Sequence, residues 1–185
     1  MRVISGEYGG RTLKSLKGTT TRPTTDKVKE AVFHIIGPYF DGGTVLDLYS
    51  GSGSLGIEAV SRGMSTAYLV DKNGEAISVI DENIRMTKEE SKFVVWRKTD
   101  HQALAELKRT DKKLDLVLLD PPYAHEELNS ILQKLIDFDL LNESALIVCE
   151  TDKRVSIDFG DESLELYKEK VYGASKITFF EWVNK

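Results

Sequence analysis

The sequence predicts an α/β fold of the Rossmann-like type, in which a mostly parallel, seven-stranded sheet lies between helices. Five short apolar runs alternate with stretches of helical periodicity, and a glycine-rich stretch follows the first run. Runs without polar alternation are typical of parallel strands buried on both faces. Two more strand-like runs at the C-terminal end have no helix between them, so we expect an antiparallel hairpin at the sheet edge.

The elements follow one another with recognisable start and stop residues. The first helix is predicted from Thr24, its N-cap, to the break at Gly37. The expected order then is strand 44–48, helix 54–62, strand 67–70, helix 74–86, strand 93–96, helix 101–108, strand 114–119, helix 126–137 and strand 145–149. The last two strands are predicted at 164–172 and 176–183.

Ahead of the first helix, residues 1–14 predict a small hairpin with a glycine-rich turn. We expect residues 1–23 to form a basic extension on one compact domain of residues 24–185. The net charge of −5 argues against a protein that coats nucleic acid, but residues 1–35 carry +4 and the remainder −9. A basic segment on an acidic body is a localised footprint for nucleic acid, although solvated lysines produce the same count.

The composition is that of an ordinary globular protein. The 185 residues are 41% hydrophobic and 30% charged, which excludes a largely disordered chain. No apolar stretch approaches the ~18 residues of a membrane span, and the first residues lack the apolar region of a signal peptide. The single cysteine, Cys149, lies in an apolar run and is predicted to be a core residue. A lone cysteine forms no intrachain disulfide, which favours a cytoplasmic location.

A glycine motif follows the first predicted strand. Gly51, Gly53 and Gly56 match G-x-G-x-x-G in a strand–loop–helix context, and Asp71 comes 20 residues after Gly51. At that spacing an acid reaches the hydroxyls of a bound ribose. The pattern alone is the dinucleotide fingerprint, so an NAD-dependent oxidoreductase is an open alternative.

Two further acids favour S-adenosylmethionine (SAM) over NAD. Asp47, at the tip of the first strand, would repel a pyrophosphate and suits the α-ammonium of SAM. Asp100 follows the third strand, where it could hold an adenine amino group. Together with Asp71, these acids suit an ammonium, an amine and two hydroxyls. The alternative interpretation, that each acid caps a helix, fits any one of them better than it fits all three.

The fourth predicted strand ends at Asp120, which Pro121, Pro122 and Tyr123 follow. The prolines cannot continue a sheet and fix two φ angles near about −65°. A carboxylate, a rigid carbonyl and an aromatic ring are therefore expected together at the carboxyl end of a strand, where open α/β sheets bind ligands. The alternative is a turn in which the acid caps the next helix.

Three stretches resemble the bacterial RsmD family: RPTTDKVKEAVF at 22–33, DLYSGSGSLGIEAVSRG at 47–63 and LDPPY at 119–123. Members of that family use SAM to methylate the 2-amino group of one guanosine in small-subunit (16S) ribosomal RNA. The resemblance extends from Arg2 to about Trp182. It implies a class I SAM-dependent methyltransferase fold, with ribosomal RNA, free or in an assembled particle, as the partner.

The resemblance also implies roles for particular residues. The residues expected to hold SAM are Asp47, Tyr49, Gly51, Gly53, Leu55, Asp71, Lys72, Asp100 and His101. Those expected to hold the target base are Asp120, Pro121, Pro122 and Tyr123. Those expected on the RNA side are Arg2, Arg11, Lys14, Arg22 and Thr24, of which the last two, with Pro23, would close over the methionine end of SAM. Tyr49-Ser50 and Asp71 stand where the family usually has Phe-Ala and Glu, which is expected to change the fit near the cofactor.

The implied chemistry concerns an exocyclic amine, whose nitrogen is a poor nucleophile because its lone pair is delocalised into the ring. If the Asp120 carboxylate and the Pro121 carbonyl accept its two hydrogens, the nitrogen can pyramidalise toward the methyl donor. Tyr123 would stack on the extruded base.

Other functions remain open at this level. A DNA or RNA methyltransferase acting on adenine N6 or cytosine N4 would use the same four residues, although DNA enzymes usually carry an added recognition domain. An RNA-binding assembly factor without catalysis is a further class. The three histidines are scattered, with no neighbouring cysteines, so we expect no metal. We expect a monomer.

Overall fold

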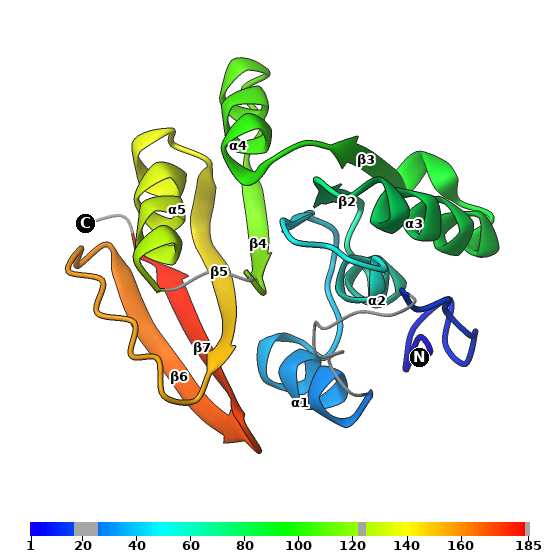
Figure 1. Ribbon diagram of the computed structural model, residues 1–185, viewed down its shortest axis with the longest axis horizontal. Coiled ribbons are helices and arrows are strands. Elements are labelled where there is room, and N and C mark those ends of the chain that lie inside the picture. Colours follow the sequence, from blue (N-terminus) through cyan, green and yellow to red (C-terminus); the bar gives the residue numbers. More distant parts are fainter. Residues whose placement is uncertain (17–25, 122–124, 184–185) are drawn as a thin grey trace.

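The computed structural model describes residues 1–16, 26–121 and 125–183, and the side chains of residues 125 and 126 lie outside that description. It contains one seven-stranded sheet (Figure 1). From edge to edge, its strands are β3 (Phe93–Arg97), β2 (Thr66–Asp71), β1 (Thr44–Asp47), β4 (Leu114–Leu119), β5 (Leu141–Asp152), β7 (Ser175–Trp182) and β6 (Leu164–Tyr172). The first five are parallel, β7 is antiparallel to β5, and β6 is antiparallel to β7. The predicted fold class is confirmed.

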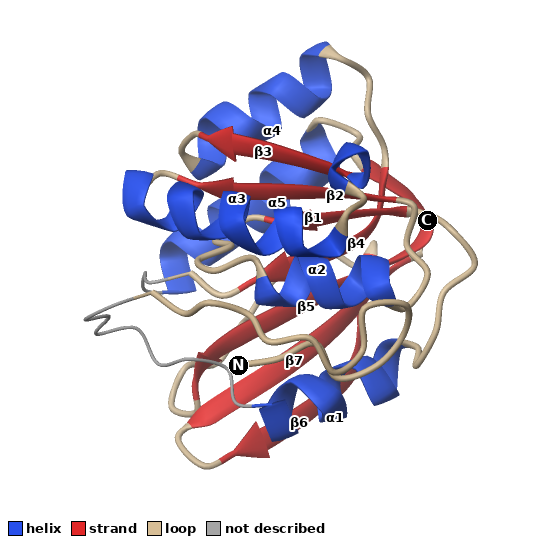
Figure 2. Ribbon diagram, turned by 90° about the vertical axis from the view of Figure 1, so that its right-hand side faces the viewer, coloured by secondary structure: helices blue, strands red, loops and turns tan. Residues whose placement is uncertain are grey.

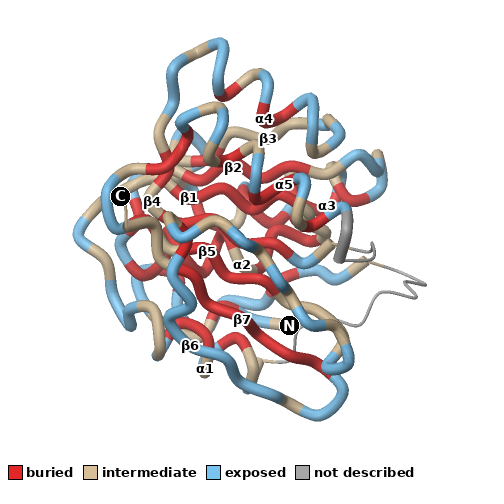
Figure 3. The backbone as a smooth tube through the Cα atoms, turned by 90° about the vertical axis from the view of Figure 1, so that its left-hand side faces the viewer, coloured by how far each residue is buried: buried red, intermediate tan, exposed pale blue. Residues whose placement is uncertain are grey.

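Helices cover both faces of this sheet (Figure 2). They are α1 (Asp26–Ile36), α2 (Ser54–Ser61), α3 (Gly74–Thr87), α4 (Asp100–Arg109) and α5 (His125–Asp137), with a short 3₁₀ turn at Glu90–Lys92. One core cluster joins α4 and α5 to the sheet through Leu46 and Val117, and the other joins α1, α2 and α3 through Val45 and Leu116. Adjacent strand residues point to opposite faces, so each central strand supplies apolar side chains to both clusters, and buried residues fill the central strands (Figure 3).

The predicted strands and helices agree with the structure to within a few residues, with one larger difference. Strand β5 begins at Leu141, whereas the sequence predicts it at 145. Leu141 pairs with Leu114, and regular pairing resumes at Leu146 with Leu116 after an irregularity in register. The intervening Asn142–Ser144 stretch is partly or fully exposed. Because it is polar, it lacks the apolar pattern by which a buried strand is recognised.

The N-terminal arm, defined here as residues 1–16, doubles back as predicted, but through one isolated bridge between Arg2 and Thr12 instead of two regular strands. Val3, Tyr8 and Leu13 are buried in the same cluster as α1, α2 and α3. Burial of such side chains contributes about 1.5–3 kcal/mol each. The arm is therefore part of the folded body and packs on its helices instead of pairing along its own length.

A buried ionic cluster fastens the start of this arm. Lys29 on α1 lies 3.4 Å from Glu58 Oε1 on α2 and donates to the Arg2 carbonyl at 2.5 Å and to Ser54 Oγ at 2.9 Å. Burial lowers the pKa of Lys29, and the Glu58 carboxylate opposes that shift. Glu58 also accepts from Arg62 Nε at 2.7 Å. Since a buried charge is costly without partners, the three side chains hold the arm, α1 and α2 together. No helix in the described part of the chain is long and apolar enough to span a membrane.

Candidate active site

The carboxyl ends of β1, β2 and β4 meet at one edge of the sheet. Asp47 ends β1 and pairs with Leu69 of β2 on one side and Leu118 of β4 on the other. Asp71 ends β2 beside Arg97 of β3. Asp100, predicted with these two, is the first residue of α4 and comes three residues after the end of β3 at Arg97. The topology thus places the three acids at successive strand ends, where ligands of open α/β sheets bind.

The glycine-rich loop between β1 and α2 has the backbone that its sequence requires. Gly51 and Gly53 have φ of +60° and +85°, in the left-handed region that disfavours other residues. A Cβ at Gly56 would come within 2.2 Å of the Leu69 side chain, so this glycine permits close packing of α2 on β2. Among the described residues, a Cβ at Gly51 would meet just the Leu16 side chain, at 3.8 Å.

The Asp47 side chain forms its hydrogen bonds with the glycine-rich loop and the start of α2. Its side chain is 3% exposed, and Oδ2 accepts from the Gly56 amide and from Ser50 Oγ, each at 3.0 Å. Burial raises the pKa of Asp47 to about 6, aided by the charge of Asp71 and opposed by the two hydrogen bonds. These contacts indicate that Asp47 shapes the loop around the ligand position, and a direct contact with an ammonium stays a prediction.

Asp71 joins the same loop to the end of β2. Its Oδ2 accepts from the Gly51 amide and its Oδ1 from the Asn73 amide, both at 2.9 Å. The side chain is half-buried. The N-cap of α3 is Asn73, which accepts from the Glu75 amide. Asp71 is therefore not the cap of that helix, and a partly open carboxylate beside Gly51 remains available to a ligand's hydroxyls.

Asp100 is likewise not a helix cap. The cap of α4 is Thr99, which forms a capping box with Gln102. Asp100 Oδ2 accepts from the Tyr49 hydroxyl at 2.9 Å, and Oδ1 accepts from the His101 amide at 2.7 Å. Tyr49 and Asp100 are 51 residues apart, so this hydrogen bond joins the glycine-rich loop to the segment after β3.

The other predicted cofactor residues lie around this frame. Leu55 is partly buried on α2, and Lys72 is exposed just after β2, where its carbonyl accepts from Arg97. His101 is exposed, with Nδ1 2.8 Å from Lys134 Nζ. All three lie on elements that border the loop or the acids.

Asp120 stands directly after β4, the strand next to β1. The four residues before it are buried, whereas Asp120 is exposed and Pro121 half-buried. The carboxylate thus leaves the core at the same edge of the sheet as the glycine-rich loop. Pro122 and Tyr123 lie outside the described residues, as do Arg22, Pro23 and Thr24.

Three of the basic residues predicted for RNA, Arg2, Arg11 and Lys14, lie on the N-terminal arm and are exposed. Arg2 is 3.6 Å from Asp26, and Lys14 is 3.1 Å from Glu82. Arg11 donates to the Met86 carbonyl at 2.9 Å. The two ion pairs lie at the surface, where such pairs contribute little, and a role of these cations in RNA binding stays a prediction.

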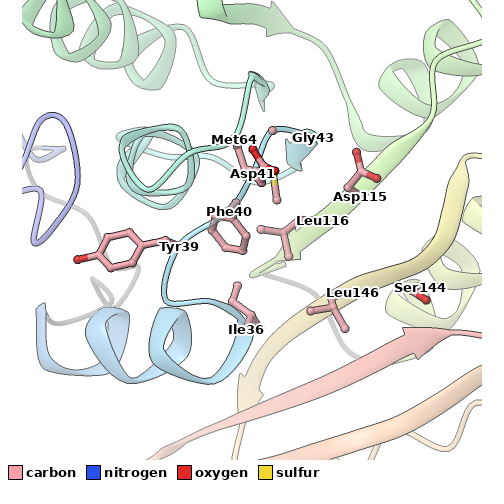
Figure 4. Close-up of a pocket in the computed structure, with 11 residues that line it drawn as sticks. Ile36, Tyr39, Phe40, Asp41, Gly43, Met64, Asp115, Leu116, Ser144 and Leu146 are labelled. Atoms are coloured by element: carbon pink, nitrogen blue, oxygen red, sulfur yellow. The ribbon is translucent and has the colours of Figure 1, made fainter.

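A hollow of about 480 Å³ lies at the other end of the strands (Figure 4). Gly43, Met64 and Asp115 line it, and they stand at or before the starts of β1, β2 and β4. Asp115 accepts from the Thr44 amide and from Asn142 Nδ2, at 2.8 and 3.0 Å. Its carboxylate therefore serves to join strand starts, and this hollow is separate from the edge that holds the predicted residues.

Two residues that build the site, Ser50 and Asn83, were not predicted as site residues. Ser50 supports Asp47, and Asn83 on α3 contacts both the loop and the arm. A polar residue in an amphipathic helix usually faces water. Asn83 is 3% exposed because the arm packs on α3, and the sequence of α3 alone does not indicate this burial. Within the described residues, no group of three or more His, Cys, Asp or Glu could hold a metal ion.

Comparisons with known proteins agree with this architecture. The family model "Conserved hypothetical protein 95" matches residues 1–181. The chain is 39% identical over 181 residues to "Putative rRNA methyltransferase YlbH" of Bacillus subtilis, covering 98% of each protein. It is 30% identical to "Ribosomal RNA small subunit methyltransferase D" of Escherichia coli K12, covering 94% of this chain and 85% of that protein.

Among solved structures, "Putative methyltransferase yhhF from Escherichia coli" superposes with a TM-score of 0.86 at 25% identity, covering 100% of this chain and 99% of that one. Because the similarity extends over nearly the whole length, the relatives share the arm as well as the sheet. The chain belongs to the family described as Conserved hypothetical protein 95, and its predicted resemblance to the RsmD family is confirmed.

Proposed function

We propose that the protein transfers the methyl group of SAM to the 2-amino group of a guanosine in small-subunit ribosomal RNA. The observation that carries this proposal is the position of Asp120 at the end of β4, beside the strand that leads into the glycine-rich loop. A methyl donor at the loop and an amine at Asp120 would then face the same edge of the sheet. The names of the relatives support the ribosomal RNA substrate.

The residues at the loop fit SAM. Among the described residues just Leu16 lies near a Cβ position at Gly51, so a ligand could approach the backbone there, and the half-buried carboxylate of Asp71 lies next to it. Asp71 would accept from the ribose hydroxyls, and Asp100, held by Tyr49, would accept from the adenine amine. When bound, SAM supplies an electrophilic methyl group on its sulfonium. Because Asp47 lies beneath the loop, its charge alone does not exclude a dinucleotide, and the case for SAM rests on Asp100 and on the family.

The chain's own part in the reaction is to position and polarise the amine. The Asp120 carboxylate and the Pro121 carbonyl would accept its two hydrogens, so that the nitrogen lone pair turns away from the ring toward the methyl group. Stronger acceptance as the N–C bond forms lowers the barrier, because it acts on charge that develops in the transition state. The methyl–sulfur bond would break as the N–C bond forms, and the nitrogen would then release a proton, which Asp120 would receive.

Nucleoside analysis tests this proposal. Small-subunit particles and free 16S RNA from a strain lacking the enzyme would be incubated with purified protein and methyl-labelled SAM, and the digested nucleosides identified by mass spectrometry. We expect label in N2-methylguanosine. Label in N6-methyladenosine or N4-methylcytidine would move the substrate to another base, and no label in either RNA sample would exclude this ribosomal RNA activity.

A further inference from the structure

Asn83 occupies an unusual position in α3. Its side chain is 3% exposed and makes three hydrogen bonds, all to backbone groups far away in the sequence. The Lys14 amide donates to Oδ1 at 2.8 Å, and Nδ2 donates to the Lys14 carbonyl at 3.0 Å. Nδ2 also donates to the Ser52 carbonyl at 2.8 Å. One amide group therefore holds the N-terminal arm and the glycine-rich loop together.

The loop partner stands at the point where a ligand would act. Ser52 lies between Gly51 and Gly53, and the Gly51 amide is bound by Asp71. A ligand that engages Asp71 and the Gly51 backbone restrains the peptide that Asn83 contacts. Leu16, at the end of the arm, also lies near the loop, since its side chain would be 3.8 Å from a Cβ at Gly51. Within the described residues, the hydrogen bonds of Asn83 thus link the arm to the loop.

The other end of the arm is anchored independently. Glu58 on α2 accepts from the Ile4 amide at 2.9 Å and from the Ser5 amide at 3.1 Å. The arm therefore stays on the body when the contact at Lys14 is removed. Arg11 and Lys14, two of the cations predicted for RNA, lie beyond this anchor, next to the contact with Asn83.

We propose that Asn83 is a positioning residue that couples the cofactor loop to the N-terminal arm. A ligand at the loop then orders the arm at Lys14, and RNA held by the arm tightens cofactor binding by the same factor, because coupling between two binding sites is reciprocal. This inference rests on the proposed function, in which SAM binds the loop and RNA the arm. A purely structural role would lower the stability of the fold without linking the two segments.

Amide exchange in the full-length protein tests the coupling without RNA. The exchange rates of the Lys14, Ile4 and Ser5 amides would be followed by NMR with and without saturating SAM, after calorimetry has established that SAM binds. In the wild type we expect SAM to slow exchange at Lys14 by about tenfold, within the range of typical coupling. The amides of Ile4 and Ser5 donate to Glu58, so the slowing of their exchange should be less than half of the slowing at Lys14.

Variants separate coupling from stability. In Asn83→Ala we expect the effect of SAM at Lys14 to fall below about twofold, while Ile4 and Ser5 stay protected. Thr87→Val is the matched control, because Thr87 is also 3% exposed on α3 but bonds locally, to the Ile84 carbonyl and the Glu89 amide. It should keep the full effect at Lys14. In Asn83→Asp the Lys14 amide keeps its acceptor but the donor to Ser52 is lost, so the effect of SAM should again fall.

The outcomes distinguish this inference from the proposed function. Failure of the wild type to bind SAM would overturn the proposed function. SAM binding without slower exchange at Lys14 in the wild type would overturn the coupling alone, whether or not the variants fold. Full SAM-dependent slowing in folded Asn83→Ala protein would also overturn it, because the link would then run through other contacts.

Discussion

The Gly51 amide donates a 2.9 Å hydrogen bond to Asp71 Oδ2, across 20 residues of sequence. This bond joins the turn after β1 to the end of β2 and leaves Asp71 partly open toward the loop. The same carboxylate thus shapes the glycine turn and is placed to accept from a ligand's hydroxyls. Its removal should affect both.

For Asp71→Ala we expect SAM binding to weaken by about 1–3 kcal/mol, because the ribose hydroxyls lose their acceptor and the Gly51 amide its partner. Calorimetry measures the change. Glu75→Ala is the control, since it removes an exposed acid from the first turn of α3. Equal losses of SAM affinity in the two variants would show that the effect comes from the change in net charge and not from the contacts of Asp71.

Tyr49→Phe removes the hydrogen bond to Asp100 and keeps the ring. Without that bond the Asp100 carboxylate is less restrained, so we expect the KM for SAM to rise by about fivefold, equivalent to about 1 kcal/mol. The kcat should change little, because neither residue is placed at the reacting amine. The control is Tyr167→Phe, at an exposed tyrosine of β6, which should alter neither constant. An unchanged KM in Tyr49→Phe would show that the restraint on Asp100 does not contribute to cofactor binding.

The raised pKa of Asp47 predicts a specific pH dependence. Because its folded-state pKa of about 6 lies above the value of about 3.8 for a free carboxyl, the protonated form is favoured in the fold. Its contribution to stability is full below pH 3.8 and is lost as the pH rises through 6. Asp47→Asn keeps an acceptor but cannot ionise. Relative to the wild type, this variant should therefore gain about 2 kcal/mol in free energy of unfolding between pH 4.5 and pH 7.5.

Urea unfolding of both proteins at the two pH values measures that difference. A constant difference across the range would show that Asp47 titrates as a free carboxyl. A difference that moves in favour of the wild type as the pH rises would mean that the charged form is the stabilised one.

The cations on the N-terminal arm predict how RNA binding depends on salt concentration. In a triple variant of Arg2, Arg11 and Lys14 to alanine, binding of 16S RNA should weaken and the slope of log affinity against log salt should fall by about one unit or less per lost contact. SAM affinity without RNA should stay unchanged, because Asn83 bonds to the backbone of Lys14. The control is alanine at Lys153, Lys168 and Lys170, exposed lysines that lie just after β5 and on the edge strand β6, outside the arm. Equal slopes for the two triple variants would place the RNA surface elsewhere.

Much of the fold could be predicted because its strands are short apolar runs. Strand β4 spans the predicted residues, and the C-terminal hairpin agrees within a residue or two. The start of β5 could not be predicted, since the polar residues 142–144 separate Leu141, which pairs with Leu114, from the apolar run that resumes the regular pairing at Leu146.

In the candidate site, the strand-end positions of Asp47, Asp71 and Asp100 follow from the alternation of elements. Their partners do not. The turn of Asp47 toward the Gly56 amide depends on how α2 packs against β1, and the burial of Asn83 depends on an arm 69 residues away. Such contacts between distant segments have no periodic signature in the sequence.

The central claim is that Asp120 acts on the transition state of methyl transfer. The alternative, that it caps a turn, predicts a stability loss of about 1 kcal/mol and little else. Asp120→Ala should leave the fold and SAM affinity nearly intact, because the side chain is exposed and follows the last buried residue of β4. Asp120→Asn should retain some activity, since its amide oxygen still accepts a hydrogen bond.

Single-turnover methyl transfer to small-subunit particles, with saturating SAM and enzyme in excess, measures the chemical step directly. For Asp120→Ala we predict a rate lower than that of the wild type by about 10²–10³ or more, the scale of losing one preorganised electrostatic contact. A folded Asp120→Ala protein that binds SAM and transfers methyl groups at near the wild-type rate would contradict the account.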